Sequence, residues 1–172
     1  MRTHRAKTDL LASIKLIEKI GKMAIEFLNS QFPENERKNG LYLTLIDRES
    51  GELTLTLKIG TMVASEWRRC LDLSISQASK LFFSLFRGHI TSFESSHDSD
   101  GLPQGAIVFD RYIWSVGGQK EEANEAIAMA LGIRRFYKPY RGVKRDFIKA
   151  VKGRTGNALF NPLEKHLIRA GC

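Results

Sequence analysis

The sequence lacks most of the features that would assign it to a class at once. It has only two cysteines and four prolines among its 172 residues, too few for a disulfide framework or a proline-rich chain. No apolar run approaches the roughly 20 residues that cross a bilayer, and no apolar segment with a cleavage site follows the basic start. Complete catalytic motifs are also missing. We therefore expect a globular cytoplasmic protein, and nothing in the sequence predicts an enzyme.

Positive charge is present, but it is confined to one part of the chain. Residues 1–132 hold 16 Lys and Arg against 17 Asp and Glu, a net charge of −1. Residues 133–172 hold 11 Lys and Arg against two acids, a net charge of +9. We expect a core domain over 1–132 and a basic, partly helical C-terminal extension over 133–172. Such a field favours anionic partners, although a solvated tail gives the same pattern.

The start of this extension also carries aromatic side chains between its cations. Cations neutralise phosphates and aromatic rings stack on unpaired bases, so the segment is a candidate site for nucleic acid or an acidic protein. Its many large apolar groups favour an extension docked on the core, and the two interpretations are compatible. The candidate anion-binding residues are Arg134, Arg135, Lys138, Arg141, Lys144 and Arg145.

Apolar periodicity predicts three long helices, over 9–31, 65–87 and 120–131. Thr8 or Asp9 is expected to cap the first, and Gly88 and Gly132 are expected to end the second and third. Two short helices are predicted in the extension, over 143–152 and 162–170. The buried stripe expected for the first helix is Leu10, Ile14, Ile17, Gly21, Ala24 and Leu28, and for the second Trp67, Leu71, Ile75, Ala78, Phe82 and Leu85.

Two antiparallel hairpins separate these helices. The first joins strands at 41–47 and 52–59, and in the second of these strict alternation places Leu53, Leu55, Leu57 and Ile59 on one face. The second hairpin joins 106–109 to 112–116 around Asp110-Arg111. Helices and hairpins in this order predict an α+β fold with an antiparallel sheet flanked by helices.

The junction Gly117-Gly118 follows the last predicted strand and opens the third helix. Free N–H groups at such a junction suit a carboxylate or phosphate, whereas a tight turn that needs glycine explains the same residues. The acidic loop 97–101 has only part of a calcium-binding pattern, so no metal site is predicted.

The second hairpin and third helix resemble a known signature. Residues 112–128 are YIWSVGGQKEEANEAIA, and the signature is approximately GAIxVSGGxxExDEAIA. It belongs to the small haem-binding and haem-degrading-like domains of the HbpS/GlcG type, which include the C-terminal domain of PduO cobalamin adenosyltransferases. The resemblance covers about residues 9–132. Gly117 stands at the family's Ser, Gln119 at its second Gly and Asn124 at its Asp.

The resemblance implies a profilin-like α+β core and haem as a cofactor. Haem iron is usually held by His. His89 is the best candidate among the histidines because the apolar residues Leu85, Phe86 and Ile90, which are its neighbours in the sequence, could shield a porphyrin. A partly exposed loop histidine is the alternative. The ligand-binding residues implied together are His89, Gly117, Gly118 and Asn124.

Three hypotheses follow. The first is a small protein that binds an anionic ligand, with haem implied by the resemblance, and that forms a homo-oligomer. The second is a nucleic-acid or acidic-partner binding protein that acts through residues 134–154. The third is a dimeric scaffold with no small ligand.

Overall fold

A four-stranded antiparallel sheet organises the molecule. The computed structural model describes residues 2–92, 94, 105–135 and 156–171. The strands are β1 (Gly40–Asp47), β2 (Leu53–Gly60), β3 (Ala106–Phe109) and β4 (Tyr112–Gly117), in the order β2-β1-β4-β3. Both hairpins are antiparallel as predicted, and β1 pairs with β4 at the centre. The fold class is therefore α+β.

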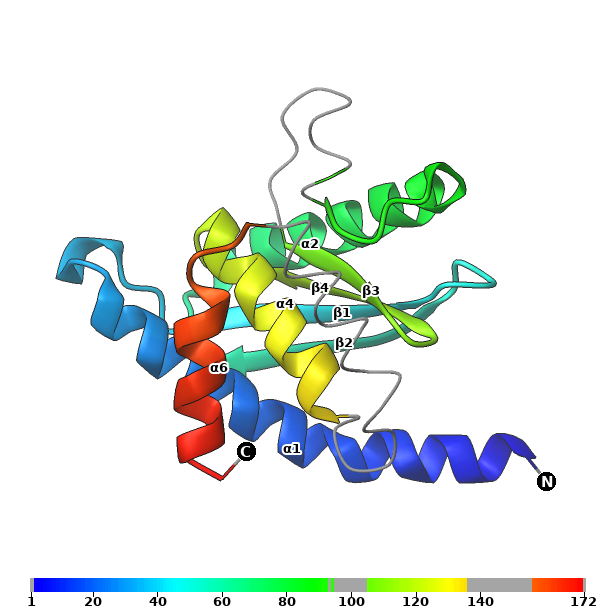
Figure 1. Cartoon of the computed structure of the whole chain (residues 1–172), viewed down its shortest axis with the longest axis horizontal. Helices are drawn as coiled ribbons and strands as arrows, with labels where there is room; N and C mark the ends of the chain where they lie inside the picture. Colours follow the sequence, from blue (N-terminus) through cyan, green and yellow to red (C-terminus); the bar gives the residue numbers. More distant parts are fainter. Residues whose placement is uncertain (1, 93, 95–104, 136–155, 172) are drawn as a thin grey trace.

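Helices cover both faces of this sheet (Figure 1). On one face lie α1 (Arg2–Gln31), α4 (Glu121–Arg135) and α6 (Phe160–Arg169), and on the other lies α2 (Ala64–Ser84). Two short 3-10 turns, Glu34–Glu36 and Leu85–Arg87, follow α1 and α2. None of the helices in the described part of the chain combines the length and apolar character of a membrane span.

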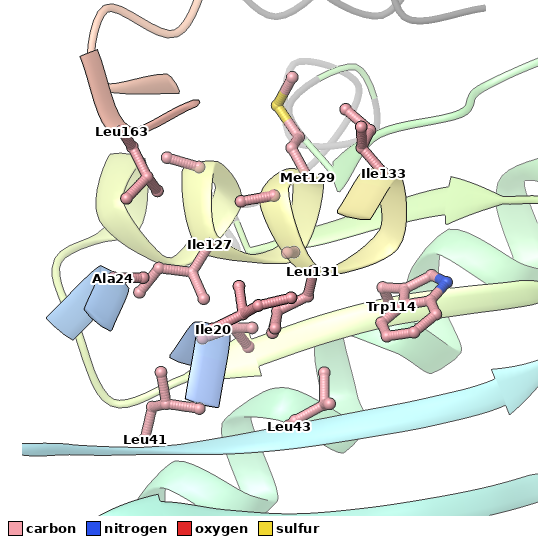
Figure 2. Close-up of a cluster of buried hydrophobic side chains, with 14 of the residues drawn as sticks. Ile20, Ala24, Leu41, Leu43, Trp114, Ile127, Met129, Leu131, Ile133 and Leu163 are labelled. Carbon is pink, nitrogen blue, oxygen red and sulfur yellow. The ribbon is translucent and has the colours of Figure 1, made fainter. Parts of the chain in front are cut away.

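The main core lies between the sheet and the helices α1, α4 and α6. Figure 2 shows Ile127 and Leu131 of α4 pointing toward Ile20 and the sheet, with Leu163 of α6 near the start of α4. All eleven residues of α4 from 123 to 133 are buried, a pattern typical of a helix enclosed on every side. The C-terminal helix predicted over 162–170 is found as α6, and its buried Phe160, Leu163 and Leu167 belong to this core.

The β1–β2 hairpin contains an irregularity that alternation did not predict. Leu45 pairs with Leu55, but Ile46 pairs with Leu53, so Thr54 is an extra residue on β2. Residues paired across two antiparallel strands point to the same face of the sheet. Ile46 belongs to the cluster beneath α2, so Leu53, its partner, is on the α2 face as well. The prediction that Leu53 shares a face with Leu55, Leu57 and Ile59 is therefore wrong.

The buried face of α2 also differs from the predicted stripe. Its buried residues are Cys70, Ser74, Gln77, Ala78 and Leu81, and of the predicted residues only Ala78 is fully buried. Polar partners on the sheet explain the difference. Ser74 shares a hydrogen bond of 2.7 Å with Thr44 of β1, and Ser115 of β4 donates to Gln77 at 3.2 Å. The predicted apolar stripe lies along the flank of the helix, partly exposed.

The helix ends confirm one prediction and correct two. Gly88 ends the Leu85–Arg87 turn in the left-handed conformation, at a φ of 77°. The predicted cap at Thr8 or Asp9 is wrong because α1 begins at Arg2, and Arg5, Ala6 and Lys7, just before the predicted cap, are good helix formers. Gly132 does not end α4 but lies inside it. A Cβ there would approach the Cβ of Phe109 to 3.2 Å, so the glycine allows close packing on β3.

Candidate functional site

Two glycines form the β4–α4 junction, and a different structural constraint requires glycine at each of them. At Gly117 a Cβ would lie 2.4 Å from the carbonyl oxygen of Cys70, so only glycine lets β4 end against the backbone of α2. Gly118 has a φ of 128°, a conformation that side chains disfavour. Both residues are therefore explained by the tight turn itself, one of the two interpretations open from the sequence.

Asn124 secures the same turn from inside α4. Its Oδ1 accepts a hydrogen bond of 2.9 Å from the backbone N–H of Gln119, and its Nδ2 donates to the Gln119 carbonyl at 3.0 Å. The Gln119 side chain in turn donates to the carbonyl of Gly40, at the start of β1. Asn124 is 1% exposed and its amide is used on both sides, so it positions the junction.

A surface groove of about 490 Å³ lies between this junction and the N-terminal half of α2. The groove joins the candidate junction to α2 residues that the sequence analysis did not identify. Nothing near Arg69 in the sequence indicates that this residue is a neighbour of Gly118. The lining residues are Arg69, Asp72, Leu73, Ser76, Gln119, Lys120, Glu121 and Asn124.

The groove contains charged groups of both signs. Within the described residues neither Arg69 nor Asp72 forms an ion pair. Lys120 pairs with Glu36 and lies 4.8 Å from the centre of the Phe32 ring, so its charge is partly engaged. The first turn of α4 adds N–H groups that have no partner inside the helix. Arg69 is thus the cation most available to a ligand.

His89 lies at the other end of the sheet. The carbonyl of its neighbour Ile90 accepts a hydrogen bond from Val108, and Val108 pairs with Ile113. Ile113 precedes Gly117 by four residues, or about 13 Å along a strand. The structure therefore does not bring His89 together with Gly117, Gly118 and Asn124. The predicted apolar shield is also incomplete, since Phe86 is 82% exposed.

The described lining of the groove does not fit haem. Haem iron takes His, Cys, Met or Tyr ligands, and none of these is among the lining residues. Leu73 is the single aliphatic side chain among them, which gives a porphyrin face little apolar surface. Cys70 lies nearby with its Sγ 3.6 Å from the Sδ of Met62, but burial raises the pKa of its thiol and so disfavours the thiolate that binds metals.

The basic candidates of the extension are only partly within the described residues. Arg134 and Arg135 form the last turn of α4. Lys138, Arg141, Lys144 and Arg145 lie outside the described residues, as do the predicted helix over 143–152 and the acidic loop 97–101.

Comparisons of this chain with protein-family models, curated proteins and solved structures find no match. The resemblance to the haem-binding domains thus stays a prediction.

Proposed function

We propose that this chain is a cytoplasmic, profilin-like α+β domain that binds a small molecule through an anionic group, a carboxylate or a phosphate. The binding site is the groove between α2 and the β4–α4 junction. The anionic group contacts the Arg69 guanidinium and the N–H groups of the first turn of α4. The proposal includes no covalent step and no iron.

One observation carries the proposal: an arginine without an ion pair among the described residues lines the same groove as the start of a helix. An arginine and a helix N-terminus are each favourable for anions, and here they face one space. Helices on both faces of an antiparallel sheet support the profilin-like assignment.

The proposal is tested by titrating inorganic phosphate, acetate and haemin into 15N-labelled protein. Phosphate or acetate should produce saturable amide shifts at residues 119–123. A charge-assisted hydrogen bond is worth about 1.5–3 kcal/mol, so Arg69→Gln should weaken binding about tenfold or more. Asp72→Asn removes a like charge from the groove and should strengthen binding of the same anion.

Arg68→Gln is the matched control. Arg68 precedes Arg69 on α2, is exposed and does not line the groove, so its loss should change the affinity less than twofold. Shifts scattered over surface lysines, or equal losses in the Arg68 and Arg69 variants, would overturn the proposal. Saturable binding of haemin that survives Arg69→Gln would replace it with the haem hypothesis.

The charge asymmetry of the sequence favours a second candidate function, binding of a nucleic acid or another acidic polymer through residues 134–154. The wild type would then bind a single-stranded oligonucleotide with an affinity that falls steeply as the salt concentration rises. Replacing Lys138, Arg141, Lys144 and Arg145 by Gln would abolish this binding. The Arg69→Gln variant would leave that binding unchanged, which separates the two functions.

A further inference from the structure

We propose that a second copy of this chain docks at the end of the molecule where α2 ends, through an aromatic patch made of Leu53, Phe82, Phe83 and Phe86. This surface is distinct from the proposed ligand groove, which is lined by the N-terminal half of α2. The resulting contact pairs the same patch on both copies around a twofold axis.

Three of the four patch residues are large apolar side chains that the fold leaves exposed, and the fourth, Phe82, is partly buried. Phe86 is 82% exposed, Phe83 is 71% exposed and Leu53 is 55% exposed. A fully exposed aromatic side chain presents about 150–250 Å², so the two phenylalanines offer roughly 300 Å² on each copy. Exposed apolar surface of this size, when contiguous, is typical of an interaction site.

Contacts of Phe82 connect Phe83 to the β1–β2 turn. The rings of Phe82 and Phe83 meet edge to face at 5.5 Å between centroids. Phe82 also contacts the β1–β2 turn, where a Cβ at Gly51 would lie 2.8 Å from the ring. The extra residue at Thr54 turns Leu53 onto this face, opposite Ile46, whose cluster Phe82 packs against. The irregularity in β2 therefore places an exposed aliphatic group on the same sheet face as α2.

The charges around the patch favour a protein partner over a polyanion. The two hairpin turns and the Leu85–Arg87 turn carry three cations and three acids in balance: Arg48, Arg87, Arg111, Glu49, Glu52 and Asp110. Of these, Arg111 also pairs with the buried Asp47 of its own copy. The whole chain has a net charge of +8, so most approaches of two copies are repulsive. At this end each copy offers both signs, which a second copy in antiparallel orientation can match. Figure 1 shows both turns at the same end as the C-terminus of α2.

Size also supports an isologous contact. Two copies of the patch contribute roughly 600 Å² from the phenylalanines, and a specific interface buries about 1,200–2,000 Å² in total. Leu53 and the charged turns surround the rings and supply further area. The aromatic pair then acts as the buried centre, where most binding energy concentrates.

Sedimentation over a range of concentrations tests this proposal on the full chain. The wild type should show a reversible equilibrium between monomer and dimer. Phe86→Ser should raise the dimer Kd about thirtyfold or more, as expected for a central aromatic anchor, and the double variant with Phe83→Ser should be monomeric. Both positions are exposed, so the circular dichroism of the variants should match the wild type, and so should their unfolding midpoint at concentrations below the dimer Kd, where association adds no stability.

Ile168→Ser is the matched control, because Ile168 of α6 is also 55% exposed but lies away from the patch. It should leave the equilibrium unchanged. A wild type that stays monomeric, a dimer that survives the double variant, or an equal loss with Ile168→Ser would each overturn the proposal. Growth beyond dimers would also overturn it, since an isologous contact closes at two copies.

Discussion

Replacing Ser74 by Ala should destabilise the protein more than replacing its partner Thr44 by Val. Both residues are fully buried, and their hydroxyl oxygens lie 2.7 Å apart. Ser74 also donates to the carbonyl of Leu71 at 2.9 Å, which leaves its oxygen as the acceptor for the Thr44 proton. Each hydroxyl has one proton, so the direction of the pair is fixed.

The two substitutions therefore leave different groups behind. Ser74→Ala leaves the Thr44 O–H buried without an acceptor, at a cost of about 1–3 kcal/mol, and the higher helix propensity of Ala recovers about 0.5 kcal/mol. Thr44→Val removes a donor while Ser74 keeps its bond to Leu71, so the cost should be below about 1 kcal/mol. In the Thr44→Val background, Ser74→Ala should cost close to nothing.

A double-mutant cycle in urea, followed by tryptophan fluorescence, measures these values. The coupling energy between the two positions should be about 1 kcal/mol or more. Equal costs for the single variants, or additive costs in the double variant, would refute the assigned direction of the hydrogen bond.

Two further predictions concern packing and pH. Burial raises the pKa of Asp47, but hydrogen bonds from Arg111 and from two backbone N–H groups outweigh it, and the net pKa is lowered. Asp47→Asn should therefore lower Tm by roughly 2–4 °C at neutral pH. The difference should begin to shrink as the pH falls below about 4, the pKa of an unfolded aspartate, and should vanish only below the lowered pKa of the folded carboxyl. A difference that grows in acid would contradict the assignment. Gly132→Ala should destabilise the protein by about 1 kcal/mol in urea despite better helix propensity, because the new methyl group would press on the Cβ of Phe109. A gain in stability would mean that α4 can move away from β3.

The hairpins were predictable because alternation is a local property. The predicted strands agree with the observed bounds to within one residue, since turn residues and period-two patterns are both visible in the sequence. The face of Leu53 was not predictable, because one extra residue at Thr54 depends on how β2 pairs with β1.

The orientation of α2 escaped prediction for a related reason. Its apolar residues form a clear stripe in the sequence, but the Ser74 hydroxyl and the Gln77 amide make hydrogen bonds to β1 and β4 and turn a different face of the helix toward the sheet. Such a match requires knowledge of which strand residues lie beneath the helix. Buried polar groups are invisible to hydrophobic periodicity until their partners are known.

The candidate site was half predictable. The junction at Gly117 and Gly118 follows from a strand that ends on glycines before a helix. Arg69 and Asp72 come from α2, about 50 residues earlier, and only the packing of α2 against β4 places them beside the junction. His89 was separated from the junction by the antiparallel pairing of β3 and β4, which a sequence motif does not encode.

The enclosure of α4 has a consequence for synthesis of the chain on the ribosome. Domains fold as units while the chain emerges, at roughly 5–20 residues per second. Phe160, Leu163 and Leu167 of α6 belong to the same core as α1 and α4, so that core cannot close until residue 169 has left the exit tunnel. Until then the nascent chain presents the apolar side of α4 to chaperones, and a codon change that slows translation just before α6 would prolong that exposure without altering a single residue of the finished protein.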